Sequence, residues 1–148
     1  MSTSLRPAGQ AFFTWHTPAL VSARWPEAAQ GFAWSGDAGH LLSRGEPFVW
    51  LQAASLPEPD SLPLVRAWFR ARARALQTCC KGLIVVEPDL GQRLASRAAF
   101  ESLSAHALRV LVISKASLVH ELAPVLLSQG AGMAVGDATL RPTRTRRN

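Results

Sequence analysis

Cysteine is scarce in this chain, and the two cysteines present lie where they support little covalent or metal chemistry. Cys79 and Cys80 are neighbours among 148 residues. Adjacent cysteines rarely bond to each other, because the disulfide geometry strains the peptide between them. Neither has further Cys or His residues at the spacing that a zinc site needs. We therefore expect two reduced thiols that pack as small apolar side chains in a cytoplasmic protein.

Long hydrophobic runs and catalytic signatures are also missing. No apolar run is long enough to cross a bilayer, and the first residues show no signal-peptide pattern, so we expect no membrane span and a cytoplasmic location. The chain has neither of the common glycine-rich phosphate loops and no nucleophile elbow. Its histidines are scattered, without metal-binding spacing: His16, His40, His106 and His120. These absences predict a non-enzymatic protein with no metal and no cofactor; a small enzyme with a His/Asp pocket assembled by the fold stays open.

Acidic residues are few, 10 against 16 basic ones, which gives a net charge of +6. Half of this charge lies after Gly130, where there is one aspartate and the following four arginines: Arg141, Arg144, Arg146 and Arg147. We predict a flexible lead-in over residues 1–11, one domain over residues 12–129 and a disordered basic tail over residues 130–148. The tail arginines are candidate contacts to nucleic acid or another anion, and a purely solubilising tail explains them equally well.

Apolar residues, in contrast, are abundant enough to bury a core. They make up 48% of the chain and include five Trp and six Phe. In the middle of the chain, residues 48–51 and 83–86 are strand-like, and a helical pattern connects them. Strand, helix, strand is typical of a parallel pair in an α/β sheet. We predict one small α/β domain with a mixed, mostly parallel sheet of about four or five strands and helices packed on it.

The segment between these two strands has the clearest helical pattern. Asp60 or Ser61 can cap it, and Pro63 is tolerated in the first turn, where its missing N–H is no loss. Apolar residues spaced by three and four predict one buried face: Val65, Phe69, Ala73, Leu76 and Cys80. Arginines form a charged stripe, which a solvated helix face explains and which contact with phosphates would also explain: Arg66, Arg70 and Arg74. Lys81 and Gly82 predict the end of the helix.

Shorter patterns predict the elements on either side. Strands are expected over residues 12–15, 20–25 and 109–114, and helices over residues 90–104 and 116–128. The side chains expected to be buried in these two helices are Leu94, Ala98, Phe100, Leu118, Leu122, Val125 and Leu126.

Residues 27–46 are the least regular part of the chain. Gly31, Gly36 and Gly39 are expected to interrupt a helix. Only a short helix through residues 41–43, ended by Gly45, is predicted there.

The order of these elements resembles the STAS-like domains, the family of bacterial anti-sigma-factor antagonists, over residues 20–128. That family usually shows a strand ending in Asp and then Asp-Ser-Ser/Thr-Gly at a helix start. Here Gln52 stands in place of the first Asp, Asp60 and Ser61 match the Asp-Ser pair, and Leu62 and Pro63 follow. The resemblance implies a regulatory domain of bacterial signalling in which phosphorylation of a hydroxyl controls partner binding. Because Leu62 has no hydroxyl, Ser61 is the candidate modification site.

These features together predict a non-enzymatic regulatory or adaptor module that acts by binding another protein. The expected contact surface follows the central strand, where open α/β sheets place their binding crevices: Glu58, Asp60, Ser61, Arg66 and Arg70. Residues 34–40 are expected beside it, and Trp15 or Trp34 is the expected aromatic anchor. The alternative is a nucleic-acid-associated protein that uses the arginine stripe and the tail arginines. The sequence determines neither the partner nor the oligomeric state.

Overall fold

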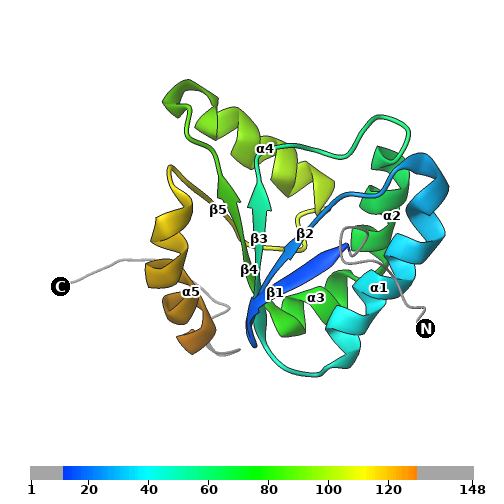
Figure 1. The fold of residues 1–148 in the computed structure, drawn as a ribbon, viewed down its shortest axis with the longest axis horizontal. Helices are drawn as coiled ribbons and strands as arrows, with labels where there is room; N and C mark the ends of the chain where they lie inside the picture. The colour runs from blue at the N-terminus through cyan, green and yellow to red at the C-terminus, as the bar shows by residue number, and fades with distance from the viewer. Residues whose placement is uncertain (1–11, 130–148) are drawn as a thin grey trace.

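Strands and helices alternate along residues 12–129, the part of the chain that the computed structural model describes (Figure 1). The strands are β1 (Phe13–Thr17), β2 (Leu20–Ala23), β3 (Phe48–Ala53), β4 (Cys80–Val86) and β5 (Val110–Ile113). The helices are α1 (Gly31–Ser43), α2 (Leu62–Ala71), α3 (Ala73–Cys79), α4 (Arg93–Leu103) and α5 (Val119–Ser128). Short 3-10 turns precede three of them: η2 (Ala28–Gln30), η3 (Leu90–Gln92) and η4 (Ala116–Leu118). The predicted lead-in and basic tail lie outside the described residues.

The five strands form one sheet in the order β1-β2-β3-β4-β5. β1 runs antiparallel to β2, and all other neighbours are parallel. The central prediction is confirmed, because β3 and β4 pair directly in parallel, with Trp50 opposite Leu83 and Gln52 opposite Val85. The domain is therefore the predicted α/β fold with a mixed, mostly parallel sheet.

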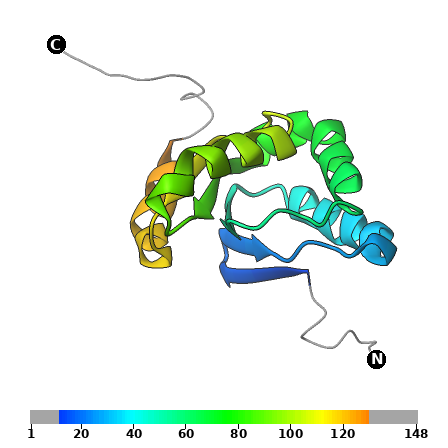
Figure 2. The same cartoon turned by 90° about the horizontal axis from the view of Figure 1, so that it is seen from above.

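The helices are divided unequally between the faces of the sheet. From β2 to β5, each strand lies beside the one before it in the chain. Crossovers of one hand then place the connecting helices α1, α2, α3 and α4 on the same face. Buried residues of these helices share one cluster, whereas α5 packs with the opposite face through Val119, Ala123 and Leu126. In Figure 2, α5 (orange) lies at one end of the domain and α1 (cyan) at the other, with the strands between them.

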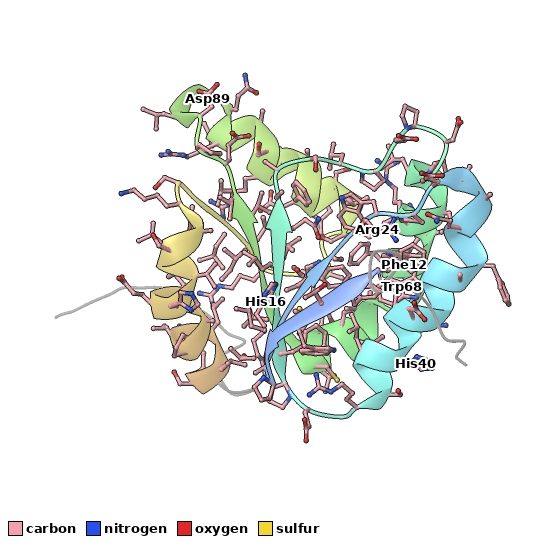
Figure 3. All side chains as sticks on the ribbon, in the orientation of Figure 1. Phe12, His16, Arg24, His40, Trp68 and Asp89 are labelled. Carbon is pink, nitrogen blue, oxygen red and sulfur yellow. The ribbon has the colours of Figure 1, made fainter. Side chains whose placement is uncertain are left out.

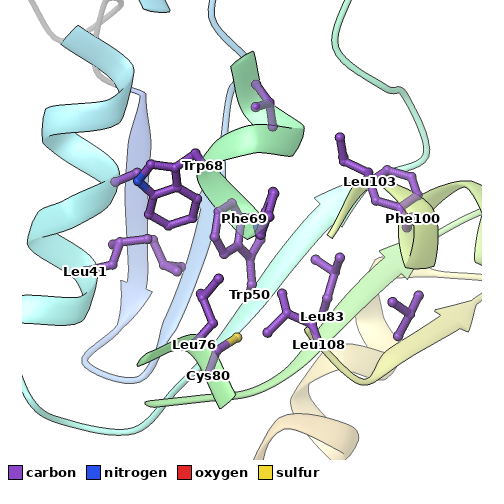
Figure 4. Packing of buried hydrophobic residues seen from close by; sticks show 14 of the residues in the cluster. Leu41, Trp50, Trp68, Phe69, Leu76, Cys80, Leu83, Phe100, Leu103 and Leu108 are labelled. Atoms are coloured by element: carbon purple, nitrogen blue, oxygen red, sulfur yellow. The ribbon is translucent and has the colours of Figure 1, made fainter. Parts of the chain in front are cut away.

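Aromatic rings fill the larger cluster (Figure 4). Trp50 of β3 and Phe69 of α2 are completely buried, with ring centroids 5.4 Å apart. Trp68 lies 5.2 Å from Phe69 and 5.3 Å from Trp34, both in edge-to-face geometry. Such edge-to-face pairs add to the free energy gained by burying the rings. This cluster joins α1 and α2 to the centre of the sheet.

The irregular segment forms a longer helix than the sequence predicts. α1 is one helix of 13 residues, although it contains three glycines. Its buried side chains explain this, because Trp34, Ala38 and Leu41 recur at helical spacing and are no more than 2% exposed. Burial of one apolar face outweighs the weak helix propensity of glycine. Gly45 does follow the helix end, with a positive φ of 71° that suits glycine.

The central helix differs from its prediction in two ways. It is divided at Arg72, whose φ of −106° and ψ of 15° separate α2 from α3. It also ends at Cys79, so that Lys81 and Gly82 belong to β4 and do not cap a helix. Gly82 instead lies close to α5, because a Cβ at this position would be 3.0 Å from Leu126 Cδ1.

Three of the side chains expected to be buried are exposed instead. Leu94 in α4 is 82% exposed, Val125 in α5 is 50% exposed, and Ala98 in α4 is exposed as well. The face of α4 that packs on the sheet carries Phe100 and Leu103, and α5 buries Leu126 as expected. The predictions for Leu94, Ala98 and Val125 were wrong because an apolar residue at roughly the right spacing fits either of two adjoining helix faces.

Candidate protein-binding surface

The predicted contact residues do not all lie at the surface. Glu58, Asp60 and Arg70 are exposed, Arg66 is half-buried, and Ser61 is only 2% exposed. The Arg66 Nε atom is buried without a hydrogen-bond partner. The arginine stripe is also interrupted, because Arg74 lies on α3, beyond the break at Arg72. Of the five predicted contact residues, only Glu58, Asp60 and Arg70 are therefore exposed.

Ser61 has a structural contact of its own. Its hydroxyl donates a hydrogen bond of 2.7 Å to the backbone carbonyl of Pro26, in the connection between β2 and α1. Ser61 stands at the N-cap position of α2, as predicted, but its side chain makes no capping hydrogen bond. Its backbone N–H instead donates to the carbonyl of Glu58 at 2.9 Å. Modification of Ser61 remains a prediction, and it requires this buried hydroxyl to be released first.

Two more hydrogen bonds connect the carboxyl ends of β2 and β3, and a third lies within β3. The amide of Gln52 donates to the carbonyl of Ala23 at 2.9 Å and accepts from the indole of Trp50 at 2.9 Å. The indole of Trp25 donates to the carbonyl of Ser55 at 2.8 Å. Both ends of the Gln52 amide are thus engaged, and the position is neutral where the resemblance would place an Asp. These side chains occupy the place where many α/β sheets form a crevice.

The tryptophans differ in exposure from one another. Trp34 is completely buried, so its prediction as a surface anchor is wrong, whereas Trp15 is 36% exposed. Trp15 is itself covered by Arg44, whose guanidinium carbon lies 3.8 Å from the ring centroid. The indole N–H groups of Trp34 and Trp68 are buried without hydrogen-bond partners, and the two rings meet edge to face. A buried indole N–H without an oxygen or nitrogen acceptor can still make a weak hydrogen bond to the face of a neighbouring aromatic ring.

An exposed apolar residue that the sequence analysis missed lies near the predicted surface. Phe32, in the first turn of α1, is 93% exposed. Its neighbour Gly31 is covered by Leu64 of α2, which lies so close that a Cβ at Gly31 would collide with it. The first turns of α1 and α2 are therefore adjacent, and Leu64 is itself 38% exposed. Leu56, 42% exposed, precedes α2.

We call this region the Phe32 surface; its residues are Phe32, Leu56, Glu58, Asp60, Leu64 and Arg70. It combines exposed apolar side chains with exposed charges of both signs. It overlaps the predicted contact surface, with Phe32 in place of Trp34 as the aromatic residue. The helical spacing of Trp34, Ala38 and Leu41 places Phe32 on the opposite face of α1. This signal was missed in the sequence analysis because the glycines argue against a helix there.

Most of the side chains that support catalysis or bind metal ions in proteins lie apart from one another. All four histidines are exposed, and Figure 3 places His16, His40 and Asp89 in different parts of the domain. His16 shares a hydrogen bond of 2.8 Å with the hydroxyl of Ser22. Within residues 12–129, no three His, Cys, Asp or Glu side chains come together in a way that would hold a metal ion.

A hollow of about 270 Å³ between β1 and α1 brings one acidic and one histidine side chain together. It is lined by Phe12, Phe13, Trp15, Asp37, His40, Leu41 and Arg44. Asp37 and His40 are three residues apart on α1, so helix geometry alone places them on the same side. A serine or cysteine nucleophile is not among these lining residues.

Both cysteines are free thiols, and Cys80 is buried as predicted. Burial raises the pKa of the Cys80 thiol to about 12 by disfavouring the charged thiolate. The thiol donates a hydrogen bond of 3.4 Å to the carbonyl of Gly82. Cys79 is half-buried. A thiol that stays neutral at physiological pH is a poor nucleophile.

Comparison with known proteins found no matching family model, curated protein or solved structure. The resemblance to STAS-like domains therefore stays a prediction. Among the helices of the described residues, none has the length and apolar character to span a membrane.

Proposed function

We propose that this chain is a non-enzymatic regulatory or adaptor module that binds another protein through the Phe32 surface. The observation that carries this proposal is the 93% exposure of Phe32 beside the half-exposed Leu64. An aromatic ring held in water on a rigid helix is the kind of residue that anchors a protein interface. A cytoplasmic location and a relationship to STAS-like regulators are parts of the same proposal.

The energetics of the Phe32 surface suit an anchor with a charged rim. Burying one Phe side chain is worth about 1.5–3 kcal/mol, enough to contribute a large part of a moderate affinity. Glu58 and Asp60 are exposed in the segment before α2, and Arg70 is exposed in its last turn. Charges at the rim of an interface act mainly on partner choice and association rate. We therefore expect the ring to set the affinity and the charges to set the specificity.

The test is affinity capture from the native cell with the intact chain, compared with Phe32→Asp and Val125→Asp. Val125 is a matched control, because it is an exposed apolar residue on the distant helix α5. A protein captured by the intact chain and by Val125→Asp, but reduced at least about tenfold by Phe32→Asp, supports the proposal. Equal recovery of every captured protein with all three chains contradicts it. Both substitutions are at exposed positions, so thermal unfolding should confirm intact folds.

The nucleic-acid alternative is separated by a second variant. Replacing the four tail arginines by Gln should abolish salt-sensitive binding to an oligonucleotide if the chain reads nucleic acid through its tail. A protein adaptor should keep its captured partner in that variant. If replacing the tail arginines abolishes capture of the partner, and Phe32→Asp does not, the nucleic-acid alternative is favoured.

A further inference from the structure

Within residues 12–129, β5 forms one of the two edges of the sheet, and no strand pairs with its outer side. β5 is the last strand in the sheet order, as Figure 1 shows. The carbonyls of Arg109 and Ile113 accept hydrogen bonds from the N–H groups of Leu83 (2.7 Å) and Glu87 (2.8 Å), toward β4. Because alternate residues of a parallel strand bond to opposite sides, Val110 and Val112 direct their N–H and C=O groups away from β4. This edge therefore offers backbone donors and acceptors to a further strand.

A groove of about 470 Å³ runs along this edge. It is lined by Arg93, Leu94 and Arg97 of α4 and by residues 109–113. Leu94 is 82% exposed, which leaves an apolar side chain in the groove wall with nothing packed over it. A groove beside a free strand edge has the shape that an extended peptide needs when it joins a sheet.

The charge of the groove is positive. The Arg93 guanidinium donates to the backbone carbonyls of Glu87 and Pro88 at 3.0 and 3.1 Å. Arg109 donates to the side-chain amide oxygen of Gln129. Only Arg97, of these three, has a carboxylate partner, Glu101 at 3.3 Å on the exposed surface of α4. Neutral oxygens do not cancel the charges of the first two, and each guanidinium has five N–H donors, so further acceptors have room to bind.

We propose that the β5 edge groove binds an extended, acidic segment of another protein as an added strand. The backbone of that segment pairs with Val110 and Val112, and its carboxylates contact Arg93, Arg97 and Arg109. A second copy of this chain fits less well, because edge-to-edge pairing would bring two sets of arginines together. The basic tail of the chain is disfavoured by the same repulsion. This inference concerns a different surface from the Phe32 surface and does not depend on it.

Nucleic acid would also satisfy the arginines, but a phosphate backbone cannot donate to the outward carbonyls of Val110 and Val112. The two ligands are therefore separated by whether backbone pairing is required. The acidic strand is favoured because the free edge and the exposed Leu94 lie in the same groove as the arginines.

The probe is a short fluorescent peptide that alternates Glu and Val, titrated into the full chain and followed by anisotropy. The same peptide with N-methyl groups on alternate backbone amides keeps its charge but loses one edge of backbone pairing. A third peptide replaces Glu by Lys, and an oligo-thymidine strand stands for nucleic acid. Two double variants carry equal net charge: Arg97→Glu with Arg109→Glu in the groove, and Arg72→Glu with Arg74→Glu at exposed positions where α2 meets α3.

We expect the acidic peptide to bind, and the N-methylated and Lys peptides to bind at least about tenfold more weakly. The groove variant should weaken binding by about tenfold or more, and the control variant by less than about twofold. Hydrogen exchange at the amides of Val110 and Val112 should slow when the peptide is bound. Thermal unfolding of both double variants establishes that neither loss is due to misfolding.

Several results would overturn the proposal. Equal binding of the N-methylated peptide would mean that charge alone attracts the probe. Equal weakening by the two double variants would mean that the groove is not the site. Tighter binding of oligo-thymidine than of the acidic peptide, with the same dependence on Arg97 and Arg109, would assign the groove to nucleic acid. No binding of the acidic peptide would also refute it.

Discussion

On one face of the sheet, α1 to α4 pack over large aromatic rings, whereas on the other face α5 packs over aliphatic side chains. The first face buries Trp34, Trp50, Trp68, Phe69 and Phe100 almost completely. The second face has Val49 and Ile84 completely buried under α5, but Leu51, Val86 and Leu111 are only half-buried. The two faces of one sheet thus differ both in side-chain size and in how far they are covered.

The order of the strands explains this difference. Because each parallel strand lies beside the preceding one, every crossover helix falls on the same face, and only a helix after the last strand reaches the other. A face covered by several helices has space for large rings between them. A face covered by one helix keeps part of its apolar surface near water. We expect stability to be concentrated in the aromatic face.

The largest expected effect comes from truncating one side chain on each face of the sheet and comparing the two losses of stability. Phe69→Ala removes a completely buried ring that contacts Trp50 and Trp68, and should lower the free energy of unfolding by about 4 kcal/mol. Leu111→Ala, at a half-buried position of the second face, should cost about 1 kcal/mol. Urea unfolding followed by circular dichroism measures both. Losses of equal size would show that the faces contribute equally.

A smaller effect is expected from two glycines that differ in their surroundings. Gly82→Ala places a methyl group 3.0 Å from Leu126 Cδ1, and should destabilise the contact between α5 and the second face by about 1 kcal/mol. Gly36→Ala, on α1 with no atom within 4 Å, should stabilise the domain by about 0.5–1 kcal/mol. Thermal unfolding gives the sign of each change. A stabilising Gly82→Ala would mean that α5 is loosely attached.

The smallest effect concerns the two neighbouring thiols. The pKa of Cys80 is raised from 9.0 to about 12, so the stability associated with its neutral form is present below pH 9 and is lost as the pH rises toward 12. The stability lost between pH 8 and pH 10.5 should therefore be less in Cys80→Ala than in Cys79→Ala. In the folded protein at pH 8, a disulfide reagent should modify the half-buried Cys79 first. Faster modification of Cys80 would contradict its burial beneath α2 and α3.

Sequence analysis succeeded where the local residue pattern and the packing in the folded domain favour the same structure. The strands β3 and β4 and the helical segment between them have periodic apolar residues, and the structure confirms their parallel pairing. The sequence also identified Glu58, Asp60 and Arg70 as surface residues. It failed for α1, whose glycines argue locally against a helix, and for Leu94, whose apolar character suggested burial.

The candidate surfaces were harder to predict than the fold. Ser61 looks like a surface hydroxyl in the sequence, but a hydrogen bond to Pro26, distant along the chain, buries it. Phe32 received no prediction from the sequence, and it is 93% exposed. The groove beside β5 unites arginines from α4 with a strand edge, and no local pattern joins segments that meet only after folding.

The sequence by itself determined the class of fold. Strand and helix patterns alternate along it, and such segments bury their apolar faces by packing helices on a mostly parallel sheet. Only the tertiary structure decided that Phe32 and Leu94 face water and that Ser61 does not. That choice depends on contacts between distant segments, such as Leu64 over Gly31 and Leu126 over Gly82, whose free energies outweigh local preferences.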